Sequence, residues 1–138
     1  MSRPLTQTQS TEHRTKLREL WNWDGGYWHP LKPQAFPNLI ALDGLKLEAL
    51  LPEEEFRSVL ESAGTGAVLL FHEYLEDIET TIHEMPHCYG WSEALLASPS
   101  FAWVVYWSHE NTIALGGEAI VSAFKRSVPR WESTLWLP

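Results

Sequence analysis

The stretch that decides the fold of this chain is FAWVVYWSHENTIALGG, residues Phe101–Gly117 of 138. Its first half, Phe101 to Trp107, consists almost entirely of aromatic and β-branched residues, a composition typical of a buried strand. Four polar residues, Ser108 to Asn111, interrupt this run before Thr112 to Leu115 begins a second extended one. Two extended runs joined by a short polar turn predict a β-hairpin.

Both faces of the first predicted strand are apolar. Side chains alternate along a strand, so one face holds Phe101, Trp103, Val105 and Trp107, and the other holds Ala102, Val104 and Tyr106. A strand with two apolar faces is stable only when both faces are covered. We therefore expect this strand in the middle of a sheet, with further structure packed on each side.

The composition is that of a single globular domain. Hydrophobic residues make up 44% of the chain and charged residues 20%, which excludes a wholly disordered protein. No apolar run approaches the roughly 18 residues that span a bilayer, and the first residues lack the apolar core of a secretory signal. Cys88 is the single cysteine, so no internal disulfide forms, and we expect a cytoplasmic protein.

The net charge of −8 limits the classes of partner. A nucleic-acid-binding protein should show a basic stripe, so we expect no nucleic-acid partner. Acidic surfaces attract basic partners, although they also serve solubility alone. Eight tryptophans are the compositional oddity. Most should lie in the core, and one or two that stay exposed would mark a binding surface.

The N-terminal third predicts one helix and several irregular segments. Residues 1–10 are polar and without periodicity, so we expect a flexible arm, followed by a single domain over residues 11–138. A helix is expected from Thr11 to about Asp24. Three prolines make Tyr27 to Asn38 an extended, irregular segment.

The rest of the chain alternates between helical and extended patterns. Asn38 to Leu51 is ambiguous, because it fits either a tight hairpin or the start of a helix. Further elements are expected as follows: helices at Pro52–Ala63, Trp91–Ala97 and Glu118–Val128, strands at Ala67–Tyr74 and Ile78–Ile82, and a docked tail at Arg130–Pro138. The predicted fold class is therefore α+β, with a small, mostly antiparallel sheet around an aromatic hairpin at about 101–116, packed by three or four helices.

The segment His83–Glu93, HEMPHCYGWSE, has the pattern H-E-x-x-H-x-x-G-x-x-E. In such a motif two histidines one helical turn apart bind zinc, and the glutamate between them acts as general base. The segment is similar to the zinc motif of metzincin-type peptidases. This resemblance implies His83, His87 and Glu93 as zinc ligands. It also implies Glu84 as the base.

Pro86 argues against that site. A proline there removes a backbone donor and disfavours the helical conformation at Met85, at a cost of about 3 kcal/mol in a helix interior. A zinc-dependent hydrolase is therefore the alternative reading, and we expect no catalytic residue, no metal and no cofactor. A nucleophilic pair of Cys88 with His72 or His109 also stays open.

A second candidate site is a run of acids. Five acidic residues occur within twelve positions that contain no lysine or arginine: Glu73, Glu76, Asp77, Glu79 and Glu84. Uncompensated acids repel one another, so the run is either a sheet edge kept soluble by charge or a docking surface for a basic protein. In the second case His109 and Glu110 of the hairpin turn would lie at its rim.

The chain resembles the small bacterial immunity proteins that neutralise polymorphic or contact-dependent toxins. The resemblance lies in the hairpin WVVYWSHENTIALGG, residues Trp103–Gly117, followed by the helix EAIVSAFKRSVPRW, residues Glu118–Trp131. It implies a non-enzymatic cytoplasmic protein that binds a basic partner, a toxin, through an acidic face with aromatic residues. It implies no membrane partner and leaves the oligomeric state open.

Overall fold

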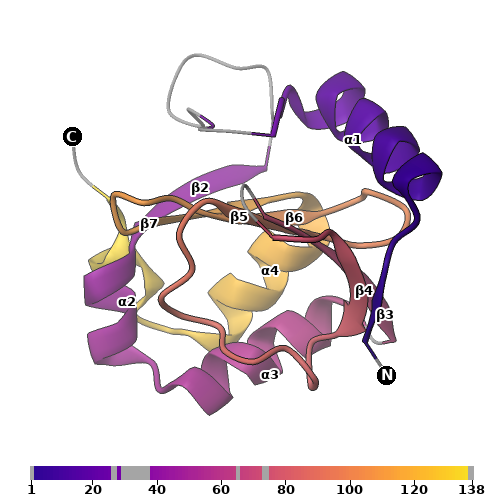
Figure 1. Cartoon of the computed structure of the whole chain (residues 1–138). Helices are drawn as coiled ribbons and strands as arrows, with labels where there is room; N and C mark the ends of the chain where they lie inside the picture. Colours follow the sequence, from indigo (N-terminus) through magenta and orange to yellow (C-terminus); the bar gives the residue numbers. More distant parts are fainter. Residues whose placement is uncertain (1, 26–27, 29–37, 65, 73–74, 137–138) are drawn as a thin grey trace.

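One antiparallel sheet runs through the middle of the described molecule (Figure 1). The computed structural model describes residues 2–25, 28, 38–64, 66–72 and 75–136. The strands within these ranges are β1 (Arg3–Pro4), β2 (Leu39–Asp43), β3 (Ala67–His72), β4 (Ile78–Thr81), β5 (Ala94–Ala97), β6 (Val104–Trp107) and β7 (Thr112–Gly116). Their order across the sheet is β1-β4-β3-β5-β6-β7-β2.

The helices lie on opposite faces of this sheet. Figure 1 shows α1 on one face and α2, α3 and α4 on the other. Their bounds, with a final 3₁₀ turn η1, are α1 (Gln7–Trp21), α2 (Gly44–Leu50), α3 (Glu53–Ala63), α4 (Glu118–Ser127) and η1 (Trp131–Thr134). This confirms the predicted α+β class with four helices around one sheet. None of the helices in the described ranges combines the length and the apolar character needed to cross a membrane.

The aromatic hairpin lies inside the sheet, as predicted. Strand β6 pairs with β7 on one side and with β5 on the other. Trp107 packs into the core that faces α3 and α4, whereas Tyr106 packs into the core under α1. The predicted alternation of faces is therefore confirmed within β6. The strand starts only at Val104, because Phe101 has a φ of 61° and belongs to the preceding turn.

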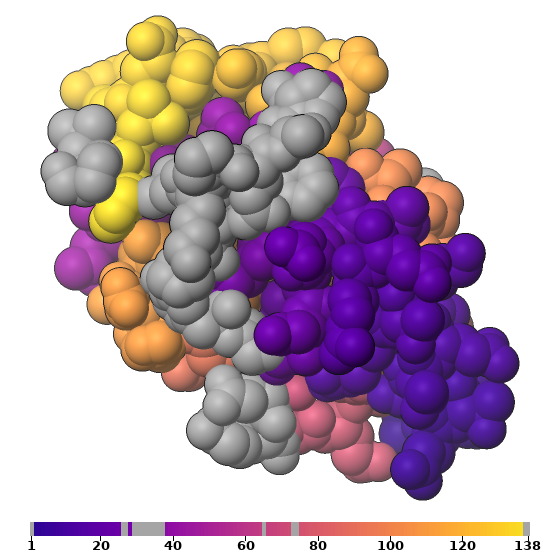
Figure 2. Space-filling view, turned by 90° about the horizontal axis from the view of Figure 1, so that it is seen from above, coloured from indigo at the N-terminus to yellow at the C-terminus, as the bar shows by residue number. Residues whose placement is uncertain are grey.

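Helix α1 covers the other core. Leu17 and Trp21 of this helix, together with Trp23 and Trp28 after it, form a cluster with apolar side chains of β3, β5, β6 and β7. Figure 2 looks down on this face and shows α1 lying over one side of it. Both faces of the central strands are thus removed from water, as a strand with apolar side chains on both faces requires.

Residues 2–10, predicted to be a flexible arm without periodicity, contain a strand and the start of a helix. Strand β1 pairs with β4, and α1 begins at Gln7 rather than after Thr11. Thr6 and Gln9 form a capping box, in which each side chain bonds the backbone N–H of the other. Capping by these polar residues determines where the helix begins. A search for apolar periodicity does not detect such caps.

The prediction of a helix at Trp91–Ala97 is wrong. Ala94–Ala97 form β5, which pairs with β3 and with β6. Leu95 packs under α1, and Leu96 packs into the opposite core. The edges of β3 and β6 supply backbone hydrogen-bond partners for Ala94–Ala97, and the two cores bury the side chains of this segment on both faces of the sheet. This tertiary context outweighs the helix propensity of alanine and leucine.

The remaining elements agree with their patterns. In the ambiguous stretch Asn38–Leu51 the helix alternative is confirmed, since α2 follows β2 with Asp43 as its N-cap, and the hairpin alternative is wrong because β2 pairs with β7. The tail docks as predicted, through a bridge between Leu42 and Leu135. The predicted irregular segment Tyr27–Asn38 lies mostly outside the described residues, apart from Trp28 and Asn38.

We expect Gly117→Ala to destabilise the fold far more than Gly66→Ala. Both glycines have a positive φ, of 110° and 89°, so each substitution carries a conformational cost of about 1 kcal/mol. A Cβ at Gly117 would also lie 2.4 Å from the carbonyl oxygen of Ala102. A Cβ at Gly66 would meet no described atom within 4 Å. The steric clash should add at least about 2 kcal/mol at Gly117.

Urea unfolding of the two variants measures this difference. Equal losses of unfolding free energy would show that the chain after β7 does not pass this close to Ala102.

Candidate functional site

One end of the sheet brings together loops that are far apart in the sequence. His72 at the end of β3 pairs with Ala94 at the start of β5, and Ala94 pairs with Trp107 at the end of β6. Trp107 in turn pairs with Ile113 near the start of β7. The segment before β5, the β6–β7 turn and the start of α2 therefore meet at this end.

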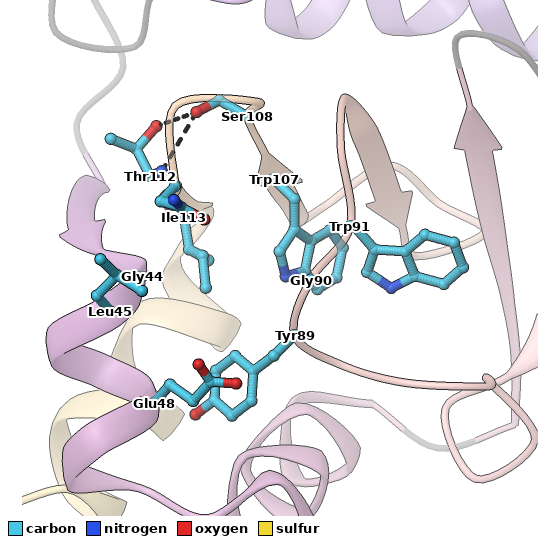
Figure 3. Close-up of a pocket in the computed structure, with 11 residues that line it drawn as sticks. Gly44, Leu45, Glu48, Tyr89, Gly90, Trp91, Trp107, Ser108, Thr112 and Ile113 are labelled. Carbon is cyan, nitrogen blue, oxygen red and sulfur yellow. Dashed lines mark hydrogen bonds between the residues drawn. The ribbon is translucent and has the colours of Figure 1, made fainter.

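A small hollow lies where these three segments meet (Figure 3). We call it the aromatic pocket, and its lining includes Leu45, Glu48, Tyr89, Trp91, Trp107 and Ser108. Its volume is about 80 Å³. Pockets for metabolites and cofactors usually measure roughly 300 Å³ or more. The size therefore suits the end of one side chain from a partner.

Hydrogen bonds to the backbone hold the three aromatic rings of the pocket. The hydroxyl of Tyr89 and the indole N–H groups of Trp91 and Trp107 each donate to a backbone carbonyl, at 2.8, 2.8 and 2.9 Å. The polar atoms of these rings are thus used inside the protein. The rings present carbon surface to the pocket in one fixed arrangement, which reduces the entropy cost of binding.

The pocket has an acidic and apolar rim. Glu48 is exposed on α2, and Leu45 on the same helix is 63% exposed. Glu110 is exposed in the β6–β7 turn, between Ser108 and Asn111, which both line the pocket. Among the described residues that line it, none is a lysine or an arginine.

The candidate nucleophiles near the pocket are not activated. The Ser108 hydroxyl is occupied by the turn, where it accepts from two backbone N–H groups and bonds the hydroxyl of Thr112. Burial raises the pKa of the Cys88 thiol to about 11, so this thiol is protonated at neutral pH. The two ring nitrogens of His72 are buried and bond no side chain among the described residues, and the Nδ1 of His109 bonds Glu93. The open alternative of a Cys88 pair with either histidine therefore finds no support.

Glu93 fixes the β6–β7 turn beside the pocket. Its carboxylate is buried and accepts hydrogen bonds from the hydroxyl of Tyr106, from the backbone N–H of His109 at 3.0 Å and from the imidazole of His109. The Tyr106 oxygen in turn accepts from the backbone N–H of Trp28. Glu93 has a φ of 51°, a conformation that costs about 1 kcal/mol or more and that these bonds offset.

The predicted zinc motif does not form a helix. His83 and Glu84 lie in turns, and His87 stacks on Trp91 with ring centroids 4.0 Å apart. Glu93, the third implied ligand, is engaged with Tyr106 and His109 instead. Within the described ranges, no three histidine, cysteine or acidic side chains are placed to hold a metal ion. The break agrees with the effect expected of the proline in this segment.

Two of the predicted docking acids have internal basic partners. Asp77 is buried and ion-paired with Arg14 at 2.7 Å, and Glu79 pairs with Arg3 at 2.8 Å. Burial alone would raise the pKa of Asp77, but hydrogen bonds from Arg14 and Ser10 outweigh this and hold it below its ordinary value. The premise that these acids are uncompensated is therefore wrong, because both arginines come from the N-terminal segment.

The other predicted docking residues are divided between two ends of the sheet. Glu76 is exposed at the end where β4 begins, the end that also holds the turn with His109 and Glu110. Glu84 follows the opposite end of β4, where it bonds Thr81. Glu73 lies outside the described residues.

The residues that sequence reasoning missed are Leu45, Glu48 and Tyr89. Their helix and loop patterns contain no signal for a site, because the pocket exists only where α2 meets the end of the sheet. Trp91 is partly buried and lines the pocket, but Trp131 and Trp136 are partly buried as well, so exposure of tryptophan alone would not have identified it.

A second hollow lies between α3 and the turn after β4. It is lined by Glu54, Glu61 and His83 among others. Arg57 in the same groove bonds the backbone carbonyl of Met85 and the carboxylate of Glu53, so its charge is used internally. No phenylalanine, tyrosine or tryptophan lines this groove among the described residues, and we therefore base the functional argument on the aromatic pocket.

Comparison of the chain with protein-family models, with curated proteins and with solved structures found no match. The functional argument therefore rests on the geometry described above.

We expect the stability of the protein to fall as the pH drops below 6.5, the ordinary pKa of histidine, and His72 to cause part of this fall. Burial lowers the pKa of His72, as do the charges of His87 and Arg14, while the backbone of Glu76 and the charge of Asp77 oppose the shift. The unfolded chain therefore takes up this proton at a higher pH than the folded protein does, and protonation favours unfolding.

His72→Phe keeps a ring against Trp91, which lies 4.7 Å from His72 between centroids, and removes the titration. Its unfolding free energy should change less than that of the unmodified protein between about pH 7 and pH 5. The exposed His83→Phe is the control and should keep the full dependence. Identical pH profiles for the protein and its His72→Phe variant would contradict the assignment.

We expect Glu93→Gln and Tyr106→Phe to be strongly coupled. Tyr106→Phe removes the donor of a buried hydrogen bond, and Glu93→Gln replaces one of the two accepting carboxylate oxygens by an amide group that cannot accept, so each should cost about 2 kcal/mol. The double variant should be less destabilised than the sum, by about 1 kcal/mol, because the second change removes a group that has already lost its partner. Urea unfolding of the four proteins measures this coupling, and strict additivity would contradict the network.

Proposed function

We propose that this chain is a non-enzymatic cytoplasmic domain that binds one basic protein through the face around the aromatic pocket. The observation on which the proposal rests is a small pocket with fixed aromatic walls, bordered by the exposed Glu48 and Leu45. Binding hot spots in protein interfaces have this form, an anchor site of well-packed aromatic residues inside a more polar rim.

The charge of the protein supports a basic partner. The net charge is −8, and exposed acids at this end of the sheet include Glu48, Glu76 and Glu110. A surface of one sign raises the rate at which an oppositely charged partner arrives and discourages partners of like charge. The apolar rings and Leu45 then provide the area that stabilises the complex.

The chemistry of the pocket supports binding over catalysis. The hydroxyl of Ser108 is used by its turn, the thiol of Cys88 is protonated, and the volume of about 80 Å³ holds little beyond one side-chain end. The zinc-hydrolase alternative requires two histidines on one helix, an arrangement that His83 and His87 do not have. No observation favours that alternative, and we do not pursue it.

The resemblance to toxin-immunity proteins suggests what the binding is for. In that class the partner is a toxin, often a basic nuclease, and the complex blocks it. We propose the same role here, with the partner as a basic toxin and the pocket face as the blocking surface.

A photo-crosslinking amino acid placed at position 45 tests the docking face. We expect it to capture one protein with a high isoelectric point in cells of the source organism. The matched control is position 20, because Leu20 is also half exposed but lies on α1, on the opposite face of the sheet. Capture through position 20 and not through position 45 would contradict the proposal.

The captured protein, purified and mixed with this chain, should form a one-to-one complex. Glu48→Gln and Glu110→Gln should each weaken the complex about tenfold and reduce its salt dependence, because each removes a charge from the face. Glu54→Gln on α3 is the control for loss of one exposed charge elsewhere. A complex with an acidic protein, or one that none of these changes weakens, would overturn the proposal.

A further inference from the structure

We propose that the aromatic pocket takes a single arginine side chain of the partner, with its guanidinium between the Tyr89 and Trp107 rings and the Glu48 carboxylate. This inference rests on the proposed function, since it names the group that anchors the basic partner. It goes further in assigning one residue type to one place on the surface.

The walls of the pocket suit a cation. Tyr89 and Trp107 line it and are 8% and 2% exposed, and their own donors are already bonded to backbone carbonyls, so the small part of each ring that reaches the pocket is carbon surface rather than an N–H or O–H group. A guanidinium placed against a tryptophan or tyrosine ring is attracted by the ring quadrupole. Tyr89 also stacks on Phe56, with ring centroids 5.2 Å apart, which holds it in position.

A carboxylate lies beside these rings. Figure 3 shows the side chain of Glu48 extending from α2 toward Tyr89. Both residues line the pocket, and burial first and then the negative charges nearby, among them Glu48, raise the pKa of Tyr89. A guanidinium between them would receive the π-surface on one side and the carboxylate on the other, which is a charge-assisted contact.

The pocket favours arginine over lysine. The guanidinium is flat and weakly hydrated, so it loses less than an ammonium when it leaves water for an apolar wall. It also has five N–H donors in one plane, and the Glu48 carboxylate in the lining offers two oxygens that can accept from two of them. A lysine ammonium would use fewer of these acceptors and would keep more of its water.

The pocket is formed before the partner arrives. The backbone N–H of Gly44 donates to the carbonyl oxygen of Asn111 at 2.7 Å, which joins α2 to the β6–β7 turn across one wall. A Cβ at position 44 would lie 2.8 Å from that oxygen, so only glycine allows this approach. A site held in its binding shape avoids the cost of ordering on binding.

Nuclear magnetic resonance with N-acetyl-arginine methylamide tests the assignment. We expect saturable shifts of the backbone amides of Gly44 and Gly90 and of the indole N–H of Trp107, with a dissociation constant of about 1–10 mM for so small a ligand. The citrulline analogue has the same shape without the charge and should bind at least about tenfold more weakly.

Glu48→Gln should reduce arginine binding about tenfold, because it removes the charge and keeps the shape. Glu54→Gln, an exposed glutamate outside the pocket, should leave it unchanged. The lysine analogue should bind more weakly than the arginine analogue, and equal binding would overturn the choice of arginine.

The arginine assignment also fails if no saturable shift occurs at these three probes, if citrulline binds equally well, or if Glu48→Gln has no effect. These outcomes leave the docking face to be judged by crosslinking at position 45, which does not depend on the arginine contact. Capture of a basic partner through position 45 without an arginine response would refute this inference and support the proposed function. Saturable arginine binding with capture through position 20 instead of position 45 would show an arginine site in the pocket and contradict the proposed docking face, and with it the assignment of that site to a partner.

Discussion

The structure depends on the burial of two adjacent aromatic residues on opposite faces of one strand. Tyr106 and Trp107 follow each other in β6, so each requires its own apolar layer and its own partner for a polar atom. Tyr106 bonds Glu93 under the layer of α1, and Trp107 bonds the carbonyl of Cys88 on the side of α3 and α4. The three-layer architecture is the arrangement that meets both requirements at once.

The same requirement produces the candidate site. The partners of the two aromatic residues, Glu93 and Cys88, lie in one segment, which must therefore cross the end of the sheet between them. Tyr89 and Trp91 lie within that segment and reach the β6–β7 turn as a consequence. The positive φ of Glu93 is the local cost of this path. Packing of the core and shaping of the pocket are thus results of the same set of contacts.

The fold, and not their spacing in the sequence, decides which acidic residues share a surface. The acids of β4 fall close together in the chain, but Arg3 and Arg14 pair with two of them and remove them from the docking surface. Glu48 and Glu110 lie far apart in the chain and border the same pocket face. The fold thus places two exposed carboxylates that are distant in the sequence beside the same aromatic pocket.

The sequence by itself determined the α+β class, the aromatic hairpin with its two faces, and the helices α3 and α4, because periodicity, prolines and glycines are local signals. It did not determine β5, since the run ALLA fits helix and strand equally until two neighbouring strands offer hydrogen bonds. Only the tertiary structure joined Arg14 to Asp77, 63 positions apart, and Glu48 to Tyr89 and Trp107. Such contacts have no signature in a single sequence, because they depend on which surfaces the packed sheet brings together.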